Sequence, residues 1–303
     1  MTSVAETLRR LGGCATWTEL RGAHSARALR RACASGSVVR TARGRYSLPE
    51  VDEHRALAAA RTATLSHLSA ALAHGWKVKT VPDCAWVTVR RKRRLRPADR
   101  EGIRPHWHDL TEAELAAGVT APVRTVLDCA RVLPFDEALA VADSAVRAGA
   151  VSLGELREAA GSTRGPGATA ARRVARHADG RAANPFESVL RALALEVGLV
   201  LTPQLVIAEP GLFAVVDLGS EELRLAVEAD GFETHGTRRG LRKDCRRHTE
   251  LAVHAWSSLR YVYEDVMFEQ EWTCWTLRSW ADVRAGRPVS SPPLRAQGPA
   301  EAA

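Results

Sequence analysis

Two carboxylates end a short alternating pattern in residues 225–235, which read LAVEADGFETH. Apolar residues at every second position from Leu225 predict a strand with one face in a core, because successive side chains of a strand point to opposite faces. The other face ends in Glu228 and Asp230, and His235 follows five residues later. Carboxylates side by side repel unless a cation or a proton lies between them. The pattern therefore indicates either the solvated end of an ordinary strand or a metal site.

The segment that starts at Asn184 predicts a capped helix ahead of this strand. Asn184 is expected as the N-cap, Pro185 at the first helical position and Gly198 at the end. Apolar residues at helical spacing, from Phe186 to Val197, form the face that would pack on a core.

Strands and two further helices complete this predicted domain. PQLVI, FAVVDLG and LRLAVEAD read as three strands, and the turn GSEE at 219–222 joins the second and third as an antiparallel hairpin. A basic helix (LRKDCRRHTELAVHAW), a strand (SLRYVY) and a helix from Glu264 to Trp280 follow. The predicted order over residues 184–285 is α-β-β-β-α-β-α.

This order, with acids on the second and third strands, resembles the PD-(D/E)XK nuclease superfamily and, more narrowly, its very-short-patch-repair endonuclease type. The resemblance covers roughly residues 184–282, and its most specific part is the E-x-D-G-x-x-x-H segment that starts at Glu228. The residues that carry it are Glu187, Gln204, Val216-Asp217-Leu218, Glu228 to Gly231, His235, Asp244, Arg247, Leu259-Arg260-Tyr261 and Asp265-Val266.

The resemblance implies a restriction-endonuclease-like fold and a DNA endonuclease that uses Mg²⁺ or Mn²⁺. Asp217 and Glu228 would be the metal ligands, with the Ala229 carbonyl or Asp230 close by. His235 would act as the general base or hold the attacking water, and Glu187 would complete the water network. The cationic side chains expected to contact DNA phosphates or to neutralise charge are Arg242, Lys243, Arg246 and Arg247.

One position departs from the superfamily pattern. The superfamily's lysine, two residues after the acid, is Asp230 in this sequence. In the short-patch-repair type that lysine is also missing and histidine is thought to take over, so the departure leaves catalysis open without a lysine. It equally leaves open a degenerate domain that keeps the fold and only binds nucleic acid.

The first 50 residues predict three helices followed by a hairpin, the order of a winged helix-turn-helix. Thr16 or Thr18 would cap the second helix and Ser25 the third, and the hairpin would turn at Arg43-Gly44. The side chains expected to contact DNA, from the third helix and the wing, are Arg27, Arg30, Arg31, Arg40, Arg43 and Arg45. Alternatively, the same fold would serve protein contacts, with these arginines merely solvated.

A middle α/β unit is predicted over residues 55–160. Its segments LSHLSAALAHGW and PVRTVLDCAR, with the winged helix before them, resemble the antitoxin of abortive-infection type IV toxin–antitoxin systems, in which the front domain binds operator DNA. This resemblance implies DNA as a partner and a cognate toxin as a further candidate.

The run GSTRGPGAT opens a linker and connecting helix (161–183), and the proline-containing tail (286–303) is expected to be disordered. The predicted fold class is thus α+β with α/β parts, in five segments: 1–50, 55–160, 161–183, 184–285 and 286–303.

Charge is unevenly distributed along the 303 residues. The net charge is +8, and residues 1–110 contain 21 Lys and Arg against 9 Asp and Glu. A basic front half favours contact with polyanions.

The six cysteines lack a paired spacing, and Cys245-Arg-Arg-His248 has no second half-site for zinc. No apolar run approaches the roughly 20 residues of a membrane span. We therefore expect a cytoplasmic protein with reduced thiols and no membrane partner.

Three functions remain open from the sequence. The first is a metal-dependent DNA endonuclease delivered by a winged helix. The second is a non-catalytic DNA-binding regulator or antitoxin with a degenerate nuclease fold. The third is a nuclease acting on RNA, for which the sequence offers no separate support.

Overall fold

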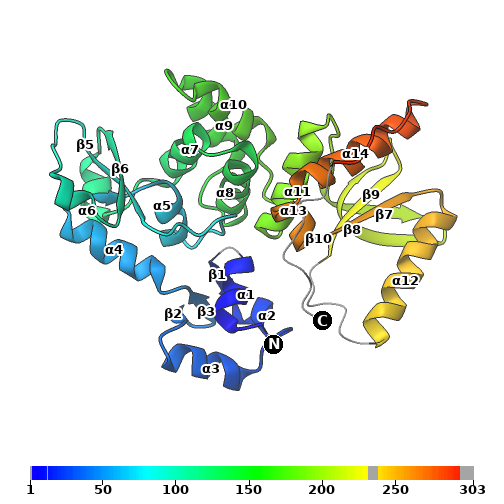
Figure 1. Cartoon of the computed structure of the whole chain (residues 1–303), viewed down its shortest axis with the longest axis horizontal. Coiled ribbons are helices and arrows are strands. Elements are labelled where there is room, and N and C mark those ends of the chain that lie inside the picture. The colour runs from blue at the N-terminus through cyan, green and yellow to red at the C-terminus, as the bar shows by residue number, and fades with distance from the viewer. Residues whose placement is uncertain (1, 12, 231–237, 294–303) are drawn as a thin grey trace. The chain divides into compact units, whose positions relative to one another are not determined.

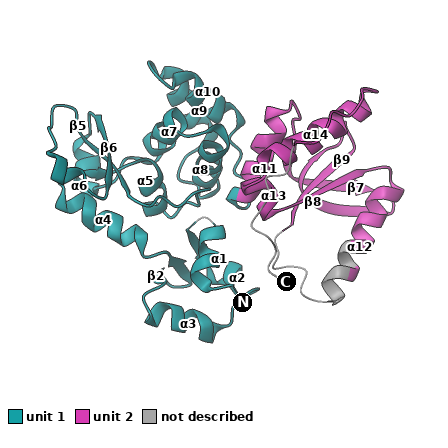
Figure 2. Cartoon of the chain, in the orientation of Figure 1, with its two compact units in different colours: residues 1–185 teal, residues 186–303 magenta. Residues whose placement is uncertain are grey.

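The computed structural model describes residues 2–11, 13–230 and 238–293, and it divides into two compact units, 1–185 and 186–303 (Figures 1 and 2). We call them unit 1 and unit 2. Each combines helices with small sheets, so the chain is of mixed α and β class, as the sequence predicted.

The front of unit 1 contains short helices and a small antiparallel sheet with strand order β1-β3-β2. Its elements are α1 (Val4–Arg10), β1 (Cys14–Thr16), α2 (Trp17–Leu20), α3 (Ala26–Ala34), β2 (Val39–Ala42) and β3 (Arg45–Ser47). Thr16 caps α2 through a reciprocal contact with Glu19, and the Ser25 hydroxyl accepts a hydrogen bond from the Ala28 N–H at the start of α3. Of the two caps considered for the second helix, Thr16 is therefore the one used.

The rest of unit 1 surrounds a second three-stranded sheet with order β4-β5-β6. Strands β4 and β5 are antiparallel, whereas β5 and β6 are parallel. The elements are α4 (Glu50–Ala60), β4 (Thr64–Leu65), α5 (His67–Ala73), β5 (Ala85–Arg90), the 3₁₀ turn η1 (Pro97–Arg100), β6 (Ile103–His108), α6 (Glu112–Ala117), α7 (Pro122–Val132), α8 (Phe135–Arg147), α9 (Leu153–Ser162) and α10 (Ala168–His177). The break that the sequence predicted at Pro134 separates α7 from α8.

Helix α10 lies within the segment 161–183 that the sequence predicted as a linker and connecting helix. Ala171, Val174 and Ala175 of this helix are buried in the main core of unit 1, together with residues of α5, α7 and α8. A helix with an apolar face gains stability by burying it against other elements. The connecting helix is therefore an integral part of unit 1, and residues 163–167 before it and 178–183 after it form no helix or strand.

Unit 2 contains a four-stranded sheet with order β10-β9-β8-β7. The pair β9–β10 is parallel, and β7–β8 and β8–β9 are antiparallel. The elements are α11 (Pro185–Glu196), β7 (Thr202–Glu209), β8 (Leu212–Ser220), β9 (Leu225–Asp230), α12 (Arg238–Val253), β10 (Ser257–Val262), α13 (Tyr263–Met267) and α14 (Gln270–Arg284). The hairpin predicted between the second and third strands is present.

The predicted helix from Glu264 to Trp280 is wrong in one respect, because it is two helices. The chain leaves helical geometry between α13 and α14, at Phe268 and Glu269. The Thr273 hydroxyl donates a hydrogen bond of 2.9 Å to the Asp265 carbonyl, which satisfies a backbone acceptor at the end of α13. The Asp265 carbonyl also accepts a hydrogen bond of 3.1 Å from the Glu269 N–H, so it has two donors where α13 ends.

Two apolar clusters cover the sheet of unit 2. Leu190, Leu218 and Val227 belong to one cluster, to which α11, α13 and α14 contribute, and Val216 and Leu251 belong to the other, which includes α12 (Figure 1). No helix in the described part of the chain is both long and apolar enough to cross a membrane. Of the predicted disordered tail, residues 286–293 form no helix or strand, and the remainder lies outside the described residues.

Candidate functional site

Asp217 lies where strands β8 and β9 separate. Their ladder runs from Ser220 opposite Leu225 to Leu218 opposite Val227. Beyond that point the Asp217 carboxylate takes the place of a backbone partner, because its Oδ2 accepts a hydrogen bond of 2.9 Å from the Ala229 N–H. This contact fixes the Asp217 side chain beside the last residues of β9, which carry the other predicted acids.

Gln204 on β7 joins two of the predicted acids. Its Nε2 lies 3.1 Å from Glu187 Oε2 and 3.4 Å from Asp217 Oδ1, so one side-chain amide bridges α11 and β8. The backbone of Gln204 has a φ of +52°, although its strand neighbours Pro203 and Leu205 pair regularly with β8. A left-handed conformation is unfavourable for a residue with a Cβ, and such conformations gather at functional sites.

Glu228 is a buried acid, only 3% exposed to solvent. Burial raises its pKa from 4.5 to about 7; Arg247 opposes this shift, while the nearby carboxylates of Asp217 and Asp230 add to it. Arg247 Nη2 lies 3.3 Å from Glu228 Oε1, but without hydrogen-bonding geometry, and this oxygen has no hydrogen-bond partner among the described residues. The negative charge of an ionised Glu228 is therefore only partly offset by Arg247, and two further carboxylates lie nearby.

Asp230 ends β9 and has a cation beside it. Arg260 Nε on β10 donates to Asp230 Oδ2 at 2.5 Å, and the parallel register of β9 and β10 brings these two strand ends together. The sequence assigned no role to the individual residues of Leu259-Arg260-Tyr261. The pairing of β10 with β9, had it been known, would have predicted that Arg260 lies beside Asp230.

The structure thus brings together Glu187, Asp217, Glu228 and Asp230, four of the five predicted catalytic residues. The fifth, His235, lies outside the described residues. Among the residues that are described, no group of three or more His, Cys, Asp or Glu side chains is arranged to hold a metal ion. The two predicted ligands, Asp217 and Glu228, therefore form an acidic site whose metal binding stays a prediction.

The predicted phosphate-contacting residues fall into two groups. Arg27, Arg30, Arg31, Arg40, Arg43 and Arg45 on α3 and the β2–β3 hairpin are all exposed. On α12, Arg242 and Arg246 are exposed, Arg247 turns to Glu228, and the side chain of Lys243 lies outside the described part. Arg247 thus lies beside a carboxylate, and the roles predicted for these four residues of α12 stay predictions.

Comparison with known proteins yields relatives without an assigned function. The chain is 31% identical over 182 residues to the uncharacterised proteins MT2308 and Rv2248 of Mycobacterium tuberculosis, strains CDC 1551 / Oshkosh and ATCC 25618 / H37Rv. Each match covers 58% of this chain and 66% of the relative, so the chain spans just under two thirds of the length of these curated relatives. No protein-family model matches the chain.

Proposed function

We propose that unit 2 is a divalent-metal-dependent endonuclease domain that hydrolyses phosphodiester bonds of DNA, and that the first 50 residues bring the chain to DNA. The observation that carries this proposal is the buried carboxyl group of Glu228, whose raised pKa reflects burial beside Asp217 and Asp230. Clustered acids with perturbed pKa values are frequent at functional sites. The strand order and the separation of β8 from β9 support the restriction-endonuclease-like fold implied by the sequence resemblance.

A divalent cation fits the donors that surround Glu228. The carboxylates of Asp217 and Asp230 lie close enough to Glu228 to add to its raised pKa, and Oε1 of Glu228 is buried without a hydrogen-bond partner among the residues described. Mg²⁺ prefers oxygen ligands, needs only one or two carboxylates and keeps several waters. Asp217 and Glu228 would hold the cation, which when bound supplies Lewis acidity and lowers the pKa of a water.

The surrounding side chains would position these ligands. Gln204 holds the carboxylates of Glu187 and Asp217 through one amide, so that neither rotates freely. The Ala229 N–H fixes the second oxygen of Asp217. Before a cation binds, Arg247 offsets part of the negative charge of Glu228. His235 is proposed as the general base on its sequence position alone.

Delivery to DNA is supported by the front of unit 1. The order of α1, α2, α3 and the β2–β3 hairpin is that of a winged helix-turn-helix. Its six arginines are exposed, and arginines that contact phosphates release counterions from DNA, which favours binding. The arrangement therefore suits a module that holds duplex DNA.

A second candidate function is a DNA-binding regulator or antitoxin whose unit 2 is catalytically idle. It is favoured by the ion pairs Arg247–Glu228 and Arg260–Asp230, which already offset two of the acids with cationic side chains of the same unit. In that case the acids would be structural partners of arginines. A cognate toxin would then be a candidate partner beside DNA.

Cleavage of supercoiled plasmid tests the two candidates. Purified full-length chain is incubated with plasmid in Mg²⁺, in Mn²⁺ and in EDTA, beside Asp217→Asn and Glu228→Gln, which remove charge while nearly preserving shape. Glu222→Ala, an exposed acid in the turn after β8, is the matched control. We expect metal-dependent nicking that falls at least about 100-fold in both site variants and is unchanged in the control.

Each alternative result has a defined meaning. If wild-type chain binds plasmid but does not nick it in any metal, the endonuclease proposal fails and the regulator is supported. If nicking persists in both site variants, the acids are not the catalytic site. Cleavage of RNA but not of DNA would support phosphodiester hydrolysis by unit 2 and would show that its substrate is RNA.

A further inference from the structure

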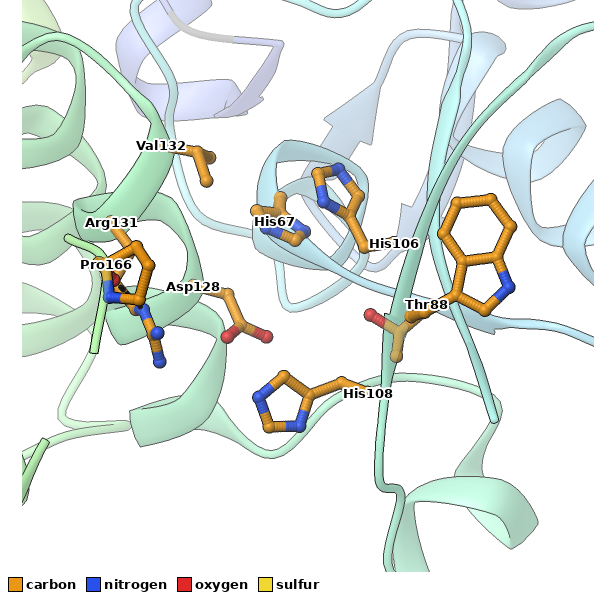
Figure 3. Close-up of a pocket in the computed structure, with 9 residues that line it drawn as sticks. His67, Thr88, His106, His108, Asp128, Arg131, Val132 and Pro166 are labelled. Atoms are coloured by element: carbon orange, nitrogen blue, oxygen red, sulfur yellow. Dashed lines mark hydrogen bonds between the residues drawn. The ribbon is translucent and has the colours of Figure 1, made fainter. Parts of the chain in front are cut away.

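A second group of ionisable side chains lines a cavity formed by residues of unit 1 alone. The cavity has a volume of about 230 Å³ and is bounded by β5, β6, the start of α5, α7 and the turn between α9 and α10 (Figure 3). The lining residues that matter for its chemistry are His67, Thr88, His106, His108, Asp128 and Arg131. We call it the histidine cavity.

Distant segments of the sequence meet in this cavity because of how the sheet and α7 are built. Thr88 on β5 and His106 on β6 are register partners in the parallel pair. Asp128 and Arg131 are three residues apart on α7 and so lie on one face of that helix. Figure 3 shows the Asp128 carboxylate between the rings of His67 and His108, with the Thr88 hydroxyl oxygen directed towards the same space.

His67 occupies its place at a conformational cost. It is the first residue of α5, only 4% exposed, and its φ is +49°. A left-handed backbone is unfavourable for a residue with a side chain and persists only where its surroundings hold it. Here its Nδ1 contacts the Ser66 hydroxyl at 2.9 Å and its ring stacks on His106 at 3.9 Å between centroids. The fold thus keeps this imidazole at the cavity wall.

Arginines lie close enough to two imidazoles of the cavity to disfavour their protonated forms. Burial lowers the pKa of His67 well below its usual value, and the charged groups that add to this shift include Arg104 and Arg124. Burial likewise lowers the pKa of His106 to about 4, again with Arg104 contributing. Both imidazoles are therefore neutral at physiological pH, and His106 Nε2 is buried with no hydrogen-bond partner in the described part of the chain.

Arg131 is oriented by carbonyl oxygens. Its guanidinium donates to the carbonyl of Pro166 at 3.0 Å and to that of Arg164 at 3.4 Å. It forms no ion pair with any residue that the structure describes, and it lines the cavity. An arginine held from one side by neutral acceptors keeps its full charge for an oxyanion on the other side.

A metal ion does not suit this cavity. Three imidazoles and a carboxylate line it, yet within the described ranges no three such side chains have the spacing to ligate one ion. Arg124 is already paired with Glu114 and with Asp128, each at 3.3 Å. Arg131 in the cavity wall and Arg104 close to two of the imidazoles therefore supply the attraction for negative charge.

We propose that the histidine cavity binds a small ligand that carries an oxyanion, either a phosphate or a carboxylate group. Arg131 binds the anionic group, the Thr88 hydroxyl donates to it, and Asp128 and His108 hydrogen-bond the polar remainder of the ligand. This proposal is independent of the endonuclease function, since it uses no residue of unit 2.

Histidine ring resonances of the full-length chain test the proposal. ¹⁵N-labelled protein is titrated separately with inorganic phosphate and with acetate, and with chloride at matched ionic strength, while two-bond ¹H–¹⁵N spectra report on the imidazoles. Substitution of single histidines by glutamine assigns the signals of His67, His106 and His108. We expect saturable shifts of these signals with phosphate or with acetate but not with chloride, and the anion that acts identifies the ligand's charged group.

Two substitutions establish whether the cavity is responsible. Arg131→Gln should weaken binding at least about tenfold. Thr88→Val keeps the shape of a fully buried side chain and removes only its hydroxyl, and should weaken binding about threefold to tenfold. Arg157→Gln, an exposed arginine of α9 outside the cavity, should bind as the wild type does. The proposal is overturned if neither anion shifts these signals saturably up to about 50 mM, or if Arg131→Gln and Thr88→Val bind as tightly as wild type.

Discussion

The acidic site of unit 2 and the histidine cavity of unit 1 both bury ionisable groups, but burial shifts the pKa values of these groups in opposite directions. In the acidic site, burial and the carboxylates of Asp217 and Asp230 raise the pKa of Glu228. Arg247 and Arg260, from neighbouring elements, offset part of the negative charge of Glu228 and Asp230. In the histidine cavity, the pKa values of the buried imidazoles are lowered, and the surrounding charges are again arginines, which reinforce the shift. The arginines offset negative charge in the acidic site, whereas in the histidine cavity they disfavour protonation of the imidazoles.

This difference indicates what each site can accept. A cation that enters the acidic site competes with two arginines for the carboxylates, so its affinity depends on how weakly Arg247 holds Glu228. Among the described residues that line the histidine cavity, Asp128 is the one carboxylate that would compete with an entering anion, and burial raises its pKa. The comparison predicts that the unfolding free energy depends on pH in opposite directions at the two sites, and that removal of the ionisable group abolishes each dependence.

Glu228→Gln should produce the largest change in stability against pH. In EDTA, the pKa of Glu228 is about 7 in the folded chain and 4.5 when unfolded, so between these values the folded chain holds a proton that the unfolded chain has released. The unfolding free energy of the wild type therefore falls as pH rises through this window, by about 3 kcal/mol from this group. Urea unfolding of Glu228→Gln should lack this decline. Parallel profiles for the two proteins would show that Glu228 ionises normally.

Gln204→Ala should reduce plasmid nicking by about 10- to 100-fold, since Glu187 and Asp217 lose their shared amide donor. Gln204→Gly removes the same amide but relieves the left-handed backbone, and should be more stable than Gln204→Ala by about 1 kcal/mol. Initial rates and urea midpoints measure the two effects separately, and a raised Mg²⁺ requirement would identify Gln204 as a positioning residue. Wild-type rates in both variants would exclude that role.

His106→Gln should change stability with the opposite dependence on pH. As pH falls from 6.5 to about 4, His106 becomes protonated in the unfolded chain but stays neutral in the folded chain. The wild type therefore loses stability in this window, by about 1–2 kcal/mol after allowance for the partial exposure of the ring. The variant should show a flatter acid limb, judged by slope because its lost stacking lowers stability at every pH. An unchanged slope would mean that His106 titrates as it does in water.

Joint replacement of Arg30 and Arg31 by alanine should have the smallest effect, about a tenfold loss of DNA affinity. If both contact phosphates, the slope of log affinity against log salt should fall by about 2. The pair Arg157→Ala and Arg278→Ala, two exposed arginines outside α3 and the hairpin, is the matched control. Equal salt slopes in all three proteins would argue against DNA contact by α3.

The sequence was informative about the acidic site because its residues lie on regular elements. The alternation in residues 225–230 and the turn after Leu218 predicted β8 and β9, and hence that Asp217 and Glu228 would approach one another. The left-handed backbone of Gln204 and the pairing of Arg260 with Asp230 were not predictable, since both depend on the neighbouring strand.

The histidine cavity could not be found in the same way. Its residues come from five separate segments, and none has a local pattern that indicates a site. His67 and Asp128 both fall in segments that carried the antitoxin resemblance, but nothing in their spacing indicates that they meet. The parallel pairing of β5 with β6 and the packing of α7 against α5 create the cavity, and these are properties of the folded chain.

Mn²⁺ binding to the full-length chain tests the central claim most directly, because it does not require that the DNA substrate be known. Titration followed by electron paramagnetic resonance at pH 8 should give about one Mn²⁺ per chain for the wild type and for Glu222→Ala. Asp217→Asn and Glu228→Gln should each lose at least about tenfold in affinity. Absence of sub-millimolar Mn²⁺ binding to the wild type, or equal binding by all four proteins, would contradict the assignment of these acids as metal ligands.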